Sequence, residues 1–204
     1  MPTEEYVIVG AGGHAKVVLD ACQRAYPGAR LEVRDDDPAK ANATLLGVAI
    51  RTPIAAALGR RCHVAMGDNA ARRRISEAVL QAGGALASVV HPAAQVSRHA
   101  AIEGGAFIAA AAVVAPQARI GRGAIVNHGA VVDHDCEVGA WSHIAPGAVL
   151  GGAASVGESC LIGSGAVLLP GVRVAAGATI GSGAVVTRDV AAGAVVTGVP
   201  GRVK

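Results

Sequence analysis

Aromatic side chains are almost missing from this chain of 204 residues, which holds one Phe, one Trp and two Tyr, or 2% of the sequence. Large aromatic side chains dominate most globular cores. The chain is nevertheless 52% hydrophobic and carries 28 glycines. This combination favours a narrow core filled with Val, Ile and Ala over an ordinary aromatic-centred core.

Other features that are rare or missing exclude several classes of protein. The four cysteines have neither disulfide nor metal-site spacing, so we expect no metal. The net charge is only +3. The longest basic cluster, Arg72-Arg73-Arg74, is interpreted as a solvated helix face and not as a nucleic-acid patch. No N-terminal region resembles a signal peptide, and no apolar run reaches the roughly 20 residues of a bilayer span. We expect a cytoplasmic protein without nucleic-acid or membrane partners.

A branched aliphatic residue recurs at every sixth position from Val90 to Val186, seventeen times without an insertion. Four places after nearly every one stands a small residue, such as Ala124, Ala148 or Cys160. Six residues suit one short strand and one tight corner, and three units make a coil of eighteen residues. The repeat predicts a parallel β-helix prism with the aliphatic residues inside. Cys136 and Cys160 occupy the small inward position and are predicted to be inert core thiols.

The N-terminal part has a different pattern. Short apolar runs predict strands over residues 6–9, 31–34, 48–50 and 64–66, and helical patterns cover residues 17–25 and 68–82, with Asn69 as an N-cap. Such alternation predicts a small parallel sheet. The period changes between residues 83 and 90, so we divide the chain into an α/β domain at 1–85 and a prism with a short tail at 86–204.

A glycine turn follows the first predicted strand. Gly10, Gly12 and Gly13 would let a phosphate approach the N-terminus of the next helix. An acid about 20 residues further on contacts ribose or base in such folds, which selects Asp35 or Asp36. The domain is too short for a full dinucleotide fold, so one nucleotide is expected instead of NAD. The alternative is a tight strand-to-helix turn with no ligand. His14 is either a contact of the nucleotide sugar or a structural residue at the helix start.

Several motifs together resemble, over the full length, the hexapeptide-repeat nucleotide-sugar N-acetyltransferases of the bacillosamine and perosamine pathways. Sialic acid O-acetyltransferases share the architecture. The motifs are Val9-Gly10-Ala11-Gly12-Gly13-His14-Ala15-Lys16, Asp35-Asp36, Ala65-Met66-Gly67-Asp68-Asn69, His91-Pro92, Val132-Asp133-His134-Asp135-Cys136, Trp141-Ser142-His143 and Gly198-Val199-Pro200-Gly201.

This resemblance implies a Rossmann-like N-terminal domain and a left-handed parallel β-helix. It implies a UDP- or GDP-linked amino sugar in the N-terminal domain and acetyl-CoA along the β-helix, between the subunits of a homotrimer. The substrate would be a 4-amino-4,6-dideoxy sugar, acetylated for surface glycan biosynthesis. A histidine at the position of His134 would act as base, assisted by an acid at the position of Asp135.

Acetyl transfer to an amine needs a proton acceptor, donors for the tetrahedral oxyanion and aligned substrates. Histidine suits the first requirement because its ordinary pKa lies near neutrality. The period places His134 at a corner, and Gly152, eighteen residues later, on the same corner one coil further along, where its N–H could face the thioester oxygen.

His143 lies half a coil from His134, so the two could share a site only across a threefold interface. We assign His143 to acetyl-CoA binding, with a packing or interface histidine as the alternative. Asn127 is assigned to substrate binding, with a structural role equally open, and His128 is left unassigned.

Three rival functions use the same features. A γ-type carbonic anhydrase would place three histidines around a metal, but His128, His134 and His143 do not have that family's spacing. A non-catalytic nucleotide-sugar binding module would bind without acetyl transfer. O-acetylation of a sialic acid-type sugar would use the same His–Asp pair, and the sequence does not separate it from N-acetylation.

Overall fold

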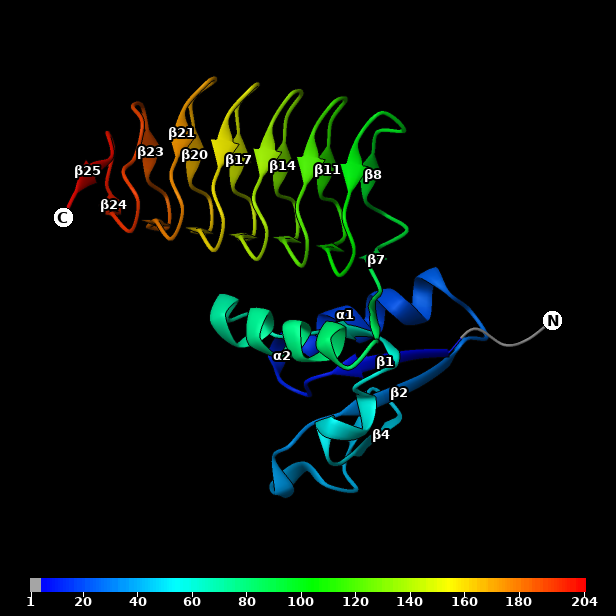
Figure 1. The fold of residues 1–204 in the computed structure, drawn as a ribbon. Coiled ribbons are helices and arrows are strands. Elements are labelled where there is room, and N and C mark those ends of the chain that lie inside the picture. Colours follow the sequence, from blue (N-terminus) through cyan, green and yellow to red (C-terminus); the bar gives the residue numbers. More distant parts are fainter. Residues whose placement is uncertain (1–4) are drawn as a thin grey trace.

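The computed structural model describes residues 5–204, which form an α/β domain and a long prism (Figure 1). The sheet of the N-terminal domain has the order β3-β4-β2-β1-β5-β6. Its elements are β1 (Glu5–Val9), α1 (Gly13–Ala25), β2 (Arg30–Arg34), η1 (Pro38–Lys40), β3 (Thr44–Leu45), β4 (Val48–Arg51), η2 (Ile54–Ala57), β5 (Arg61–Val64), α2 (Asn69–Gln81) and β6 (Ala85–Leu86). Helix α1 packs on one face of this sheet against Ile8 and Val33, and α2 packs on the other against Val7 and Val9.

Three details of this domain differ from the sequence prediction. The sheet is mixed, because the short β3 pairs antiparallel with β4. Strand β5 ends at Val64 instead of Met66, and the chain then turns toward α2. Helix α2 is capped by Asp68 and not by Asn69, because the Asp68 side chain accepts a hydrogen bond from the Ala71 N–H.

The prism consists of strands of two residues, or three in β24, that recur on three sheets. The first sheet contains β7 (Val89–Val90), β10 (Phe107–Ile108), β13 (Ile125–Val126), β16 (His143–Ile144), β19 (Leu161–Ile162), β22 (Thr179–Ile180), β24 (Val195–Thr197) and β25 (Arg202–Val203). The second contains β8 (Gln95–Val96), β11 (Val113–Val114), β14 (Val131–Val132), β17 (Val149–Leu150), β20 (Val167–Leu168) and β23 (Val185–Val186). The third contains β9 (Ala101–Ile102), β12 (Arg119–Ile120), β15 (Glu137–Val138), β18 (Ser155–Val156) and β21 (Arg173–Val174).

The predicted eighteen-residue coil is confirmed by the strand register. Phe107 pairs with Ile125, Val113 with Val131 and Arg119 with Glu137, each pair parallel. The repeated aliphatic residues point inward; those from Ile108 to Val186 are buried, whereas Val90, Val96 and Ile102 in the first coil are half-buried. Small residues between them are buried as well, including Cys136 and Cys160. Burial raises the pKa of both thiols.

The three outer faces of the prism have different chemistry. The first sheet faces the N-terminal domain, where Phe107 and Ile125 are buried together with residues of α1. The second sheet presents a valine face, made of the half-buried outward residues Val113, Val131, Val149, Val167 and Val185. The third sheet presents a charged face, made of Arg119, Glu137, Ser155 and Arg173.

The interpretation of Arg72-Arg73-Arg74 as a solvated helix face is wrong for Arg72. Arg73 and Arg74 are exposed, but Arg72 is 1% exposed. It lies on the face of α2 that also buries Ser76 and Val79. Figure 1 shows both helices on the side of the N-terminal domain that faces the prism. Among residues 5–204 no helix is long and apolar enough to cross a membrane.

Candidate active site

His134 lies at the corner between the valine face and the charged face, after β14 and before β15. The corner is tight: Asp135 has a left-handed backbone with φ 60°, and its N–H donates to the Pro116 carbonyl. The His134 N–H donates to Asp133 Oδ1 over 2.7 Å. These hydrogen bonds hold the backbone of the corner, so the imidazole projects from a defined position.

The imidazole is paired with its neighbour in sequence. His134 Nδ1 lies 2.8 Å from Asp135 Oδ2, and the two side chains are 60% and 57% exposed. The hydrogen bond to Asp135, followed by the charge of Asp133, raises the pKa of His134 above its ordinary value. In the neutral ring the carboxylate keeps the proton on Nδ1, which leaves the Nε2 lone pair free to accept a proton.

Gly152 lies directly against the imidazole, as the eighteen-residue spacing predicts. A Cβ built on Gly152 would stand 2.6 Å from His134 Nε2. The corner residues in the same column, Pro116 and Pro170, are prolines without an N–H. The Gly152 N–H donates to no backbone carbonyl within residues 5–204. Gly152 therefore brings an uncommitted amide donor next to the free nitrogen of His134.

Replacement of Gly152 by alanine is expected to lower kcat by about 10²-fold, because the methyl group would push the imidazole out of line with its substrate. Steady-state kinetics with both substrates saturating measures this. The double variant His134→Ala/Gly152→Ala is the control. It has no imidazole for the new methyl group to contact, so its activity should equal that of His134→Ala alone. A Gly152→Ala enzyme with the parental kcat would contradict the close approach.

The glycine turn leaves the start of α1 open. Gly12 is the N-cap, no side chain caps the helix, and Cβ atoms built on Gly12 and Gly13 would meet nothing within 4 Å. Gly10 has a different reason to be glycine, since its φ is 106° and a Cβ would stand 3.1 Å from the Ala65 carbonyl oxygen. Space and free N–H groups at the start of α1 suit an anionic ligand.

Asp35 and Asp36 both have partners in the chain. Asp35 Oδ2 accepts from the Ala11 N–H over 2.7 Å and from Lys40 Nζ over 3.2 Å. Burial alone would raise the pKa of Asp35, but these bonds and one from the Asp37 N–H outweigh burial and lower it. Asp35 thus ties the strand end to the glycine turn.

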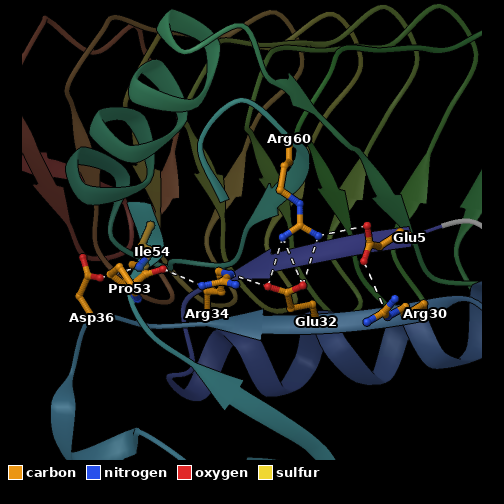
Figure 2. Close-up of polar contacts among 8 residues, drawn as sticks. All are labelled: Glu5, Arg30, Glu32, Arg34, Asp36, Pro53, Ile54 and Arg60. Atoms are coloured by element: carbon orange, nitrogen blue, oxygen red, sulfur yellow. Dashed lines mark hydrogen bonds and ion pairs between the residues drawn. The ribbon is translucent and has the colours of Figure 1, made fainter. Parts of the chain in front are cut away.

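Asp36 supports the start of η2. Its Oδ1 accepts from the Ile54 N–H over 2.6 Å, while Arg34 Nη1 donates to the Pro53 carbonyl (Figure 2). Figure 2 also shows Glu32 between Arg34 and Arg60, on the same face of the sheet. Burial alone would raise the pKa of Glu32, but the hydrogen bonds from both arginines outweigh burial and lower it. Nucleotide contacts by Asp35 or Asp36 stay predictions.

The other predicted site residues gather where the two domains meet. Asn127 Nδ2 lies 3.0 Å from His143 Nε2, and the ring centroids of His143 and His14 are 6.3 Å apart. Burial, helped by the charge of Arg72, lowers the pKa of His143 to about 4. Burial, followed by the charge of His63, lowers the pKa of His14 to about 3. All three residues therefore meet at this interface and not at the His134 corner of the same chain. The assignments of His143 to acetyl-CoA and of Asn127 to substrate stay predictions.

A pocket of about 330 Å³ opens beside this interface, and the sequence analysis missed it. It lies between α1 and the corner that joins the first sheet to the valine face, and it is lined by Lys16, Val17, Asp20, Leu46, His91, Phe107, Ala110 and His128. The eighteen-residue spacing of Ala110 and His128 is a signal that places both on one corner, but no sequence pattern indicates that α1 covers it. A larger groove of about 740 Å³ follows the charged face and contains no histidine.

Comparisons with known proteins agree with this architecture. Residues 5–79 match the PglD N-terminal domain family, and residues 117–152 and 153–188 match the bacterial transferase hexapeptide (six repeats) family. A solved structure of GDP-perosamine N-acetyl transferase from Caulobacter crescentus, in complex with CoA and GDP-perosamine, is 35% identical, with a TM-score of 0.90. The match covers 98% of this chain and 96% of that one. The chain belongs to the hexapeptide-repeat nucleotide-sugar N-acetyltransferases.

A second relative supports the same assignment. The acetyltransferase domain of PglB from Neisseria gonorrhoeae, in complex with acetyl coenzyme A, is 35% identical with a TM-score of 0.90, over 99% of this chain and 100% of that one. WeeI from Acinetobacter baumannii, at 23% identity and a TM-score of 0.83, shows the shared fold alone. A search of curated proteins found no significant match. This acetyltransferase uses acetyl-CoA as its acetyl donor. Within residues 5–204 no group of three or more His, Cys, Asp or Glu side chains could hold a metal ion.

Proposed function

We propose that this acetyltransferase transfers acetyl from acetyl-CoA to the amine of a nucleotide-linked 4-amino-4,6-dideoxy sugar, at a site shared between subunits of a homotrimer. The observation that carries the proposal is the His134 corner, where a carboxylate-paired imidazole meets an uncommitted amide N–H. The relative solved in complex with CoA and GDP-perosamine supports it, because the match covers 98% of this chain.

In the proposed reaction the amine nitrogen attacks the thioester carbon, and the new C–N bond gives a tetrahedral intermediate. The C–S bond breaks when this intermediate collapses to the amide. His134 Nε2 accepts the proton that the nitrogen loses and returns one to the sulfur of the departing CoA. Asp135, bonded to Nδ1, stabilises the imidazolium that forms in between. The Gly152 N–H donates to the oxyanion of the tetrahedral intermediate.

The nucleotide sugar is proposed to bind the N-terminal domain, with its phosphates at the glycine turn and Asp35 or Asp36 beside the nucleoside. The pocket next to α1 suits the sugar ring. Leu46, Val17 and Ala110 offer an apolar wall for a deoxy sugar, while Lys16, Asp20 and His128 offer polar groups. An apolar pocket with a few polar groups is the usual form of a small-molecule site.

The valine face supports the proposed trimer. A row of apolar side chains on the outside of a prism favours an interface with another copy. Its two edges differ: His134 lies on one, and the pocket with His128 lies on the other. Around a threefold axis beside the valine face, the His134 edge of one subunit meets the pocket edge of the next. The amine in the pocket of one subunit would then reach the base of its neighbour.

The decisive experiment is a substrate panel. UDP- and GDP-linked 4-amino-4,6-dideoxy sugars are compared with CMP- and free sialic acid, each with acetyl-CoA, and release of free CoA is measured. We expect turnover with an amino sugar and an N-acetyl product by mass spectrometry. Acetylation of sialic acid alone would establish O-acetylation instead. Binding of a nucleotide sugar without CoA release would establish a binding module.

A further inference from the structure

Arg72 is a buried cation whose guanidinium contacts no carboxylate among residues 5–204, although the charge of Asp68 acts on it. Its guanidinium donates instead to six oxygens, five of them backbone carbonyls. From the N-terminal domain these are Met66 O at 2.9 Å, Gly67 O at 3.2 Å and Asn69 Oδ1 at 2.8 Å. From the prism they are Gly123 O at 2.7 Å, Trp141 O at 2.7 Å and Ser142 O at 3.5 Å. One side chain therefore joins the two domains at several points.

In the described part of the chain, the repeat geometry leaves the Gly123 and Trp141 carbonyls without a backbone donor. Gly123 and Trp141 occupy the same corner position in successive coils, both with left-handed backbones of φ 60° and 63°. Within residues 5–204 the coil-to-coil ladder supplies no backbone N–H to either carbonyl. Where the N-terminal domain covers them, water cannot serve as the donor, and a buried carbonyl without a partner costs free energy. The planar fork of an arginine can satisfy both coils at once.

We propose that Arg72 is a positioning residue, which docks the N-terminal domain on two successive coils and so sets the pocket beside α1 relative to the His134 corners of the assembly. The effect that we expect on the KM for the nucleotide sugar rests on the proposed function. Asn69 extends the same contact to a third coil, because its Nδ2 donates to Cys160 O over 3.0 Å.

A chain of contacts links this docking point to the pocket. Neutral His143 beside Arg72 presents Nε2 to the Asn127 amide, and Asn127 Oδ1 accepts from the His128 N–H over 2.9 Å. His128 lines the pocket. Loss of the Arg72 charge removes one cause of the low pKa of His143, although burial remains the larger one. The orientation of Asn127 and of the His128 backbone thus depends on the same interface.

Three variants test the proposal: Arg72→Met, Arg72→Lys and the control Arg73→Met, whose side chain is exposed and pairs with Glu77. We expect Arg72→Met to raise the KM for the nucleotide sugar by at least about tenfold while the KM for acetyl-CoA changes little, because a shifted domain misplaces only the sugar. Arg72→Lys should not rescue the defect, since an ammonium has no planar fork. Arg73→Met should leave both constants unchanged. Equal changes in both constants, or rescue by lysine, would overturn the proposal.

Hydrogen–deuterium exchange provides a second readout that needs no substrate. In Arg72→Met the amides around Gly123, Trp141 and α2 should exchange at least about tenfold faster, while coils beyond Val167 stay as protected as in the parent. Should Arg72→Met fail to fold, Asn69→Ala removes the third-coil contact and one of the six acceptors of Arg72, and should show the same local pattern more weakly. Unchanged protection would refute the docking role. Faster exchange without turnover of any nucleotide sugar would refute the proposed function and leave the docking role intact.

Discussion

Replacement of His134 by alanine is expected to lower kcat by about 10²–10⁴-fold at neutral pH, the range typical of a lost general base. The imidazole has a free Nε2, a carboxylate on Nδ1 and an amide donor beside it, and no histidine stands on the same edge in the next coil on either side. Release of CoA with both substrates saturating measures the loss. The thermal midpoint should stay close to that of the parent, because the side chain is exposed.

The pH dependence separates a base from a binding residue. The pKa of His134 is raised by the Asp135 hydrogen bond and then by the charge of Asp133, so kcat/KM should increase with pH through that raised pKa, where the ring becomes neutral. Asp133→Asn removes a negative charge and so lowers the pKa of His134. The rise of kcat/KM with pH should then begin at lower pH, while the maximal kcat/KM changes little. In His134→Ala the deficit should shrink at high pH, where the amine loses its proton to solvent. Parental activity of His134→Ala at neutral pH would remove His134 from the mechanism.

Replacement of Val149 by aspartate should dissociate the proposed trimer and lower activity by at least about 10²-fold. Val149 lies in the middle of the valine face, between Val131 and Val167 in register. Three carboxylates brought together around a threefold axis would each lose hydration at a cost on the order of several kcal/mol. A monomer would keep its fold but lack a His134 opposite its own sugar pocket. Light scattering reports the mass, and CoA release reports the activity.

The matched control is Ser155→Asp, an outward residue at the corresponding position on the charged face. It should stay trimeric and active, because that face already carries charged side chains and is expected to face solvent. A trimeric, fully active Val149→Asp would show that the subunits meet elsewhere. A parent enzyme that is a fully active monomer would end the shared-site proposal.

Much of the active-site corner could be predicted before any coordinates. A repeat of constant length maps each residue number onto one position around the prism, so eighteen residues must equal one coil. That arithmetic placed Gly152 above His134, and the structure confirms it, because a Cβ built on Gly152 would stand 2.6 Å from His134 Nε2. It also predicted that Cys136 and Cys160 lie in the prism core, where both are buried. The His134–Asp135 pair followed from adjacency in sequence at a tight corner.

The helical spacing of α2 indicated a buried position for Arg72, but the run of three basic residues favoured an exposed one. Arg72, Ser76 and Val79 follow helical spacing and are buried together, whereas Arg73 and Arg74 point outward. Three consecutive basic residues suggested a solvated face, because a buried cation usually has an acidic partner nearby. Arg72 instead donates hydrogen bonds to backbone carbonyls of the prism. Such contacts cannot be predicted from the sequence, because every residue has a backbone carbonyl.

The sequence by itself determined the prism, its register and the chemistry of the His134 corner, because a periodic backbone turns spacing into position. Only the tertiary structure decided which face the N-terminal domain covers. That choice put His14, Asn127 and His143 at one interface and opened the pocket beside His128. The position of the N-terminal domain depends on contacts between two segments with different sequence periods, such as Arg72 with Gly123 and Trp141. The period of one segment carries no information about where the other segment packs.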